Sequence, residues 1–150
     1  MAVLQTDAET QGVLDLLGGR SVFRRSITDA GDMQAALRRG LPYAAFEAFR
    51  QVLELRSKEL ADLLGVASRT LARRKTSRQL SPIESDRLYR VAYMTRLAAE
   101  VLGSLEKARA WLHRKNRALG GVSPIRFLDT EIGERQVEEI LQRINYGTYS

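Results

Sequence analysis

Apolar positions recur along most of the chain with the three- and four-residue spacing of amphipathic helices, and short connectors separate these periodic stretches. The pattern predicts a helix over residues 32–39 that stops at Gly40, and another over residues 42–54. Residues 20–28 carry no readable period. With no internal repeat and no alternating stretch, the pattern indicates an all-α protein, a bundle of helices joined by short connections.

The longest periodic stretch follows Ser81 and is expected to form a helix from Pro82 to about Leu102. Proline suits the first helical position because the N–H that it lacks would have no partner there. Ser81 and Glu84 fit a capping box, in which each side chain accepts a hydrogen bond from an unpaired backbone N–H. One face of this helix is expected to be buried and consists of Leu88, Val91, Ala92, Thr95, Ala99 and Leu102.

Further helices are expected in the C-terminal third of the chain. A Gly-Ser pair at residues 103–104 ends the long helix and starts the next, and Pro124 opens a short one. The last helix is expected to begin near Gly133 and to close at Gly147 in the left-handed conformation that is common at helix ends. Its apolar stripe consists of Val137, Ile140, Leu141 and Ile144.

The middle of the chain carries the pattern of a helix-turn-helix. Helices are expected over residues 58–64 and 69–75, with Ser57 and Ser68 as their N-terminal caps. Gly65, between them, can adopt the positive φ that a sharp turn requires. Small and apolar side chains are expected to bring the two helices together at a fixed angle: Leu60, Ala61, Leu64, Val66 and Leu71.

The second helix of this motif is strongly basic, as in proteins that place such a helix in the major groove of DNA. Arg69 can bind a guanine through two hydrogen bonds, whereas the cations after it suit phosphates, which position a protein without specifying sequence. Arg74 stands where many such motifs have an apolar residue, so the end of this helix is expected to be shorter or more exposed than usual. The alternative is a helical hairpin with a solvated basic face. The candidate DNA-binding residues are Ser68, Arg69, Thr70, Arg73, Arg74, Lys75 and Arg78.

Composition narrows the class of protein. Hydrophobic residues make up 44% of the chain and aromatic residues only 7%, which suits an aliphatic core between helices. The absence of cysteine excludes disulfides and thiolate metal sites and favours a cytoplasmic location. No apolar run reaches membrane-spanning length, and the first residues lack the basic start of a signal peptide, so no membrane partner is expected.

The net charge of +6 is unevenly distributed. Residues 41–124 have a clear excess of basic side chains, whereas residues 125–150 have an excess of acidic ones. A basic centre suits a polyanion such as DNA. Because DNA repels an acidic segment, a different partner is expected for the C-terminal part of the chain.

No set of residues typical of catalysis appears, so neither an enzyme, a cofactor nor a metal site is expected. His113 is the only histidine, and Glu138 and Glu139 are adjacent and therefore diverge on a helix. The glycine pairs at residues 18–19 and 120–121 lack the spacing and the lysine of phosphate-binding loops.

Residues 104–150 contain several motifs in a fixed order: Trp-Leu at 111–112, Asn-Arg-Ala-Leu-Gly-Gly at 116–121, Ser-Pro at 123–124 and Arg-Ile-Asn-Tyr-Gly at 143–147. This order resembles the Xre/MbcA/ParS family of antitoxins. Upstream, Arg-Gly-Leu-Pro at residues 39–42 and the stretch over residues 80–88 also look like that family. The resemblance covers about residues 38–150.

The resemblance implies an antitoxin of a type II toxin–antitoxin system, which binds a RES-domain, NAD-consuming toxin and blocks its active site. It also implies a homodimer that binds operator DNA as an autorepressor. A ParS-type partner of an ADP-ribosylating toxin, or a regulator without a toxin, remains the alternative. The implied organisation is an N-terminal helical segment (1–40), a helix-turn-helix region for DNA binding and dimerisation (41–80) and a toxin-binding domain (81–150).

Within this toxin-binding domain, the tail offers an extended segment with rigid aromatic side chains that can enter a cleft. Acidic side chains in and just before the last helix can meet a basic rim around such a cleft: Asp129, Glu131, Glu134, Glu138 and Glu139. Trp111 is expected to anchor the core rather than contact a toxin. The candidate toxin-binding residues are Asn116, Arg117, Asn145, Tyr146, Gly147, Thr148, Tyr149 and Ser150.

Overall fold

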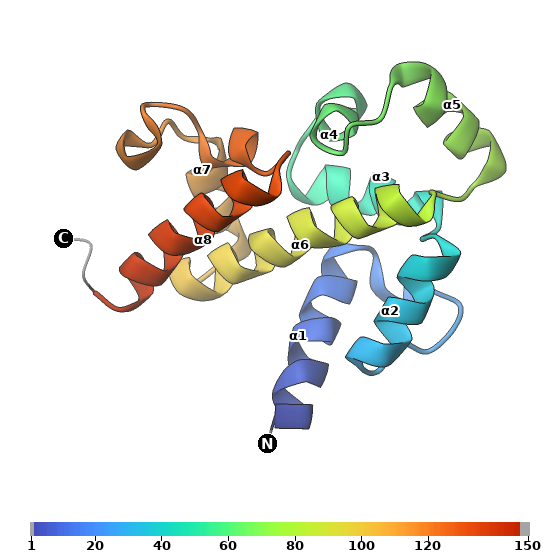
Figure 1. Ribbon diagram of the computed structural model, residues 1–150. Coiled ribbons are helices and arrows are strands. Elements are labelled where there is room, and N and C mark those ends of the chain that lie inside the picture. Colours follow the sequence, from blue (N-terminus) through green and yellow to red (C-terminus); the bar gives the residue numbers. More distant parts are fainter. Residues whose placement is uncertain (1, 148–150) are drawn as a thin grey trace. The chain divides into compact units, whose positions relative to one another are not determined.

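The computed structural model describes residues 2–147, with side chains from Ala8 onward. This described part contains helices and no strand, which confirms the predicted all-α class (Figure 1). The helices are α1 (Ala2–Leu16), α2 (Ala30–Arg39), α3 (Tyr43–Val52), α4 (Ser57–Leu63), α5 (Ser68–Ser77), α6 (Pro82–Leu102), α7 (Leu105–His113) and α8 (Glu131–Asn145), with short 3-10 helices η1 (Gly19–Ser21), η2 (Arg117–Leu119) and η3 (Pro124–Phe127).

Two compact units make up the chain, and the boundary between them falls within α6. Unit 1 runs to Ala92 and unit 2 begins at Tyr93. The helix that spans this boundary begins and ends where the sequence predicts. Its start is held by the predicted capping box, in which Ser81 N–H donates to Glu84 Oε1 at 2.9 Å and Glu84 N–H donates to Ser81 Oγ at 3.1 Å. Of the described residues, none belongs to a helix long and apolar enough to cross a membrane.

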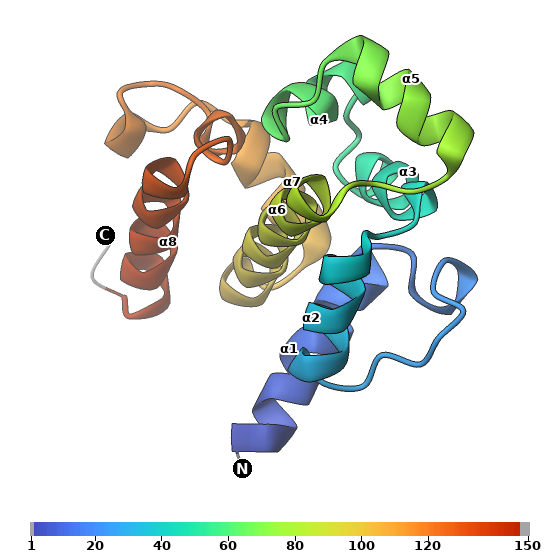
Figure 2. The ribbon, with the colours of Figure 1, turned by 45° about the vertical axis from the view of Figure 1, so that its right-hand side comes forward.

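In unit 1, α1 packs against α2 and α3, and α4 lies against both α3 and α5 (Figures 1 and 2). The core of this unit is aliphatic and aromatic, and its largest fully buried side chains include Phe46, Phe49, Leu53, Leu60, Leu64 and Leu88. Of the side chains expected between the two helices of the helix-turn-helix, Leu60, Ala61, Leu64 and Val66 are buried and Leu71 is half-buried.

The turn between α2 and α3 is tied to the segment that joins α5 to α6. Leu80 N–H donates to Leu41 O at 2.9 Å, and Tyr43 N–H donates to Arg78 O at 3.0 Å. Leu41 N–H donates to the fully buried Ser85 Oγ at 2.7 Å. Gly40 makes this approach possible, because a Cβ at this position would lie 2.2 Å from Leu80 O. These bonds fix the segment that follows the helix-turn-helix to the turn between α2 and α3.

The helix-turn-helix itself is present, but its caps differ from the prediction. Helix α4 begins at Ser57 with Arg56 as its N-cap, and α5 begins at Ser68 with Ala67 as its N-cap. The serine is not needed at the start of α4, because Glu59 Oε1 accepts the Arg56 N–H at 2.9 Å. The turn at Gly65 has a φ of 68°, the positive value expected there. Both predicted serine caps are therefore wrong by one residue.

In unit 2, η3 packs against both α7 and α8. Helix α8 begins at Glu131, capped by Thr130, whose Oγ1 accepts the Gly133 N–H at 3.0 Å. The prediction placed this start near Gly133, two residues late. Gly133 marks a packing contact instead, since a Cβ there would lie 1.9 Å from Phe127 O. Gly147 has a φ of 69°, the predicted left-handed helix end.

Candidate functional sites

Helix α5 and its C-cap residue carry a row of free cations along the sequence, on more than one face of the helix. Arg69, Arg73, Lys75 and Arg78 are exposed, and none has an ion-pair partner within the described part of the chain. Arg73 Nη2 only donates to Thr70 Oγ1, at 3.4 Å. These cations and the exposed Ser68 are therefore available to an external ligand, as a DNA-reading helix requires.

Arg74 differs from its neighbours, because its guanidinium is already engaged within the protein. Arg74 Nε lies 2.8 Å from Glu84 Oε1, and Nη2 lies 3.2 Å from Oε2. Burial raises the pKa of the Glu84 carboxyl, but the hydrogen bonds from Arg74 and from Ser81 N–H, together with the charge of Arg74, lower it by more, and the net pKa is lowered. This geometry gives Arg74 a structural partner and takes it out of the row of free cations.

A second arginine holds the turn of the motif and was not singled out from the sequence. Arg87 Nη1 donates to Leu64 O at 2.8 Å, which satisfies a carbonyl at the end of α4. Gly65 lies directly beneath this guanidinium, since a Cβ there would meet Arg87 Nη1 at 2.8 Å. The sequence could not predict this contact, because Arg87 and Leu64 are 23 residues apart along the chain.

In unit 2, Asn116 organises a tight turn. Its Oδ1 accepts the Ala118 N–H at 2.9 Å, its backbone O accepts the Gly121 N–H at 2.9 Å, and its N–H donates to Val122 O at 3.2 Å. The structure thus assigns this predicted toxin contact a local structural role. Arg117, next to it, is exposed and has no ion-pair partner among the described residues.

The C-terminal end of α8 is exposed. Asn145 and Gly147 are exposed, and 76% of the surface of Tyr146 is accessible. Thr148, Tyr149 and Ser150, the other predicted contacts of the tail, lie outside the described residues. Trp111 is half-buried on α7, and the acidic Asp129, Glu131 and Glu139 are exposed.

Two exposed apolar residues of unit 2 were missed by the sequence analysis. Ile132 is 74% exposed in the first turn of α8, and Val122 is 36% exposed after the Asn116 turn. A signal for Ile132 existed, because it stands one position before Gly133 and therefore outside the buried register of Val137 and Ile140.

Comparisons with known proteins agree with this geometry. Residues 32–93 match the antitoxin Xre-like helix-turn-helix domain, which defines unit 1 as a helix-turn-helix module. Residues 97–147 match the antitoxin Xre/MbcA/ParS C-terminal toxin-binding domain. The two matches lie in tandem and leave residues 1–31, 94–96 and 148–150 outside. The chain therefore resembles the Xre/MbcA/ParS antitoxins in two successive domains.

Individual relatives carry corresponding names. The chain is 40% identical over 80 residues to Antitoxin Xre of Pseudomonas putida, covering 53% of this chain and 50% of that protein. It is 32% identical over 94 residues to Antitoxin Xre of Yersinia enterocolitica, covering 61% and 64%. It is 24% identical over 131 residues to the Prs ADP-ribosylating antitoxin of a Sphingobium species, covering 79% and 81%. The chain thus spans between half and two thirds of the length of the first two relatives.

Proposed function

We propose that this chain is an antitoxin that binds and blocks a toxin through its C-terminal domain and binds DNA through α5. The observation that carries the proposal is the tandem match, in which a helix-turn-helix domain is followed at once by a toxin-binding domain. The free cations of α5 and the exposed apolar residues of unit 2 give each domain a surface suited to its partner. The protein then acts as an inhibitor and regulator rather than as an enzyme.

The proposed toxin is a RES-domain enzyme that consumes NAD. Two relatives that are 40% and 32% identical to this chain are both named Antitoxin Xre, whereas the Prs ADP-ribosylating antitoxin is 24% identical. This ranking favours an Xre-type pairing over a ParS-type one. An ADP-ribosylating toxin is therefore the second partner to test, and the longer alignment with the Sphingobium protein, over 131 residues, is the reason to include it.

The toxin-binding surface is proposed to include the exposed end of α8 and the turn that precedes η3. Arg117 and Tyr146 are the predicted contacts that the structure leaves accessible. Ile132 and Val122 add apolar area, which protein interfaces concentrate at their centre. Asn116 is proposed to act by holding Arg117 in place. The segment over residues 145–150 is proposed to enter the active-site cleft of the toxin.

The DNA-binding role is proposed to be repression of the protein's own operon by a dimer. Two recognition helices related by a two-fold axis read half-sites about 34–36 Å apart. Arg69, near the N-terminus of α5, is positioned to contact a base, and Arg73, Lys75 and Arg78 contact phosphates. Arg74 is left out of this set because it is bound to Glu84.

Growth measurements with two inducible genes test the antitoxin proposal. The gene for a RES-domain toxin, the proposed partner, is induced alone, with the full chain, and with an unrelated helix-turn-helix protein as control. We expect arrest in the first and third cultures and growth in the second. The antitoxin role would be contradicted if growth stopped in all three cultures although an immunoblot showed both proteins, and if the same experiment with an ADP-ribosylating toxin gave the same result. The chain would then be a regulator of transcription.

A further inference from the structure

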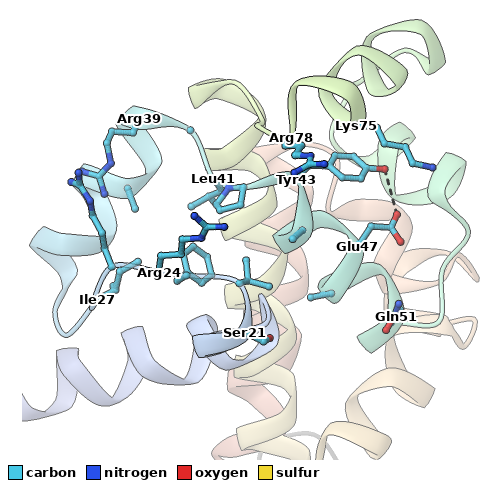
Figure 3. Close-up of a pocket in the computed structure, with 18 residues that line it drawn as sticks. Ser21, Arg24, Ile27, Arg39, Leu41, Tyr43, Glu47, Gln51, Lys75 and Arg78 are labelled. Atoms are coloured by element: carbon cyan, nitrogen blue, oxygen red, sulfur yellow. Dashed lines mark hydrogen bonds between the residues drawn. The ribbon is translucent and has the colours of Figure 1, made fainter.

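A cavity of about 920 Å³ lies within unit 1, beside the C-terminal end of α5 (Figure 3). Its lining comes from four parts of the unit: the segment over residues 21–27, the end of α2 with the turn that follows, helix α3 and the last turn of α5. Apolar side chains such as Leu41 line its interior. The cations around it are Arg24, Arg25, Arg39, Lys75 and Arg78.

The charge around this cavity is unbalanced. None of the five cations has an ion-pair partner within the part of the chain that the structure describes. The one carboxylate in the lining, Glu47, is already bound, since Arg50 Nη2 lies 3.1 Å from its Oε2 and the Tyr43 hydroxyl donates to its Oε1 at 3.4 Å. The cavity therefore presents a net positive surface that suits an anionic ligand.

The arginines at residues 24 and 25 stand on a segment that is fastened at both ends. Phe23 N–H donates to Gly19 O at 3.0 Å. At the other end, Thr28 donates to Asp32 Oδ2 through its N–H at 3.1 Å and through its hydroxyl at 3.0 Å. Between these points Ile27 is only 6% exposed. An anchored segment loses less conformational entropy on binding than a free arm would.

The arrangement of the cations favours an extended anion over a small one. Figure 3 shows Arg39 and Lys75 on opposite sides of the cavity, with Arg24 and Arg78 between them. A single small anion is usually held by groups that converge on one point. Cations spread along a rim instead match a chain of phosphates, such as one strand of a duplex.

The cavity is continuous with α5, so the extended anion that it suits is a strand of the DNA bound by α5. Lys75 and Arg78 line the cavity and also belong to the row of free cations on α5. We propose that Arg24, Arg25 and Arg39 extend the DNA-contacting surface of α5, so that the backbone phosphates flanking the site read by α5 pass over this cavity. The inference rests on the proposed DNA binding. It gives a role to the segment over residues 20–28, which lies before the residues matched by the helix-turn-helix domain.

Salt-dependent DNA binding by the full chain tests this role. The affinity for a duplex from the region upstream of its own gene is measured by fluorescence anisotropy at KCl concentrations from about 50 to 300 mM. Contacts to phosphates weaken strongly over roughly this range of salt. The variant Arg24→Gln/Arg39→Gln is compared with Arg20→Gln/Arg38→Gln, a matched control. Arg20 and Arg38 are exposed residues of the same segments and do not line the cavity.

Each lost phosphate contact lowers the slope of log affinity against log salt by about 0.9, so the cavity variant is expected to lose about 2 from the slope. The preference for the operator over an unrelated duplex should not change, because phosphate contacts carry no sequence information. Arg24→Lys/Arg39→Lys, which keeps both charges, is expected to retain most of the slope. Unchanged circular dichroism and melting temperature exclude unfolding as the cause.

The outcomes separate this inference from the proposed function. If the parent protein binds the duplex and the cavity variant has the same slope as the control variant, the inference is overturned while the DNA-binding role of α5 stands. If the parent protein binds no duplex in 50 mM KCl, the DNA-binding part of the proposed function fails and the inference fails with it.

Discussion

Arg74 of α5 and Glu84 of α6 form a two-point ion pair, with Nε 2.8 Å from Oε1 and Nη2 3.2 Å from Oε2. Both side chains are largely removed from solvent, with 29% and 10% of their surfaces exposed. The pair joins the C-terminal half of the recognition helix to the start of the long helix. In many helix-turn-helix motifs an apolar residue stands at this position, and here the ion pair takes its place in holding α5 against the neighbouring helix.

Replacing Arg74 by glutamine should lower the free energy of unfolding by about 1–3 kcal/mol, because the mostly buried Glu84 carboxylate loses its charged partner. Urea unfolding followed by circular dichroism measures the change. Arg73→Gln, an exposed neighbour on the same helix, is the control and should change the stability by less than about 0.5 kcal/mol. Equal effects of the two variants would show that the ion pair does not stabilise the fold.

The free energy of unfolding should also decrease at acidic pH, because Glu84 becomes protonated. The folded-state pKa of Glu84 lies below its ordinary value of 4.5, so its contribution is complete above about pH 4.5 and is lost as the pH falls through the lowered pKa. The difference in unfolding free energy between the parent protein and Glu84→Gln should therefore shrink between pH 5 and about pH 3. A difference that stays constant over this range would contradict the assignment.

Gly133→Ala should disrupt the packing of unit 2, because the added Cβ would lie 1.9 Å from the carbonyl oxygen of Phe127. The backbone at this point must move, so α8 and η3 cannot keep their contact. We expect a lower melting temperature and weaker toxin binding, measured by differential scanning calorimetry and by titration of the purified toxin. Gln136→Ala, an exposed site on α8, should leave the melting temperature unchanged.

The residues of α5 should differ in what they contribute to DNA binding. Arg69→Ala should reduce the discrimination between bases at one position by about 1–3 kcal/mol, because a bidentate contact to a base edge is lost. Lys75→Ala should weaken all sequences about equally and reduce the salt dependence. Competition gel shifts with single-base operator variants measure both effects. If Arg69→Ala weakened every duplex alike, α5 would not be the helix that reads bases.

The limits of the long helix could be predicted from the sequence because its signals are local. Ser81 and Glu84 are three residues apart and cap it, and a glycine at residue 103 follows its last turn. The N-caps of α4 and α5, which are Arg56 and Ala67, could not be predicted in the same way. A serine favours the cap position, but Glu59 satisfies the Arg56 N–H and shifts the start of α4 by one residue.

The roles of individual arginines depend on contacts that the sequence does not reveal. The sequence marks Arg74 as a cation where many such motifs have an apolar residue, but only the fold brings it to Glu84, ten residues further on. The same holds for Arg24 and Arg39, which belong to different segments and meet at one cavity only in the folded unit. The tight turn at Asn116, in contrast, follows from its own glycines at residues 120 and 121, which both have positive φ.

Inhibition of a purified toxin tests the central claim most directly. The rate at which the proposed RES-domain partner consumes NAD is measured with increasing amounts of the full chain and of a variant that lacks residues 145–150. We predict that the full chain stops NAD consumption at a stoichiometric ratio, whereas the shortened variant still binds DNA but inhibits poorly. NAD consumption that continues unchanged in an excess of the full chain would contradict the account.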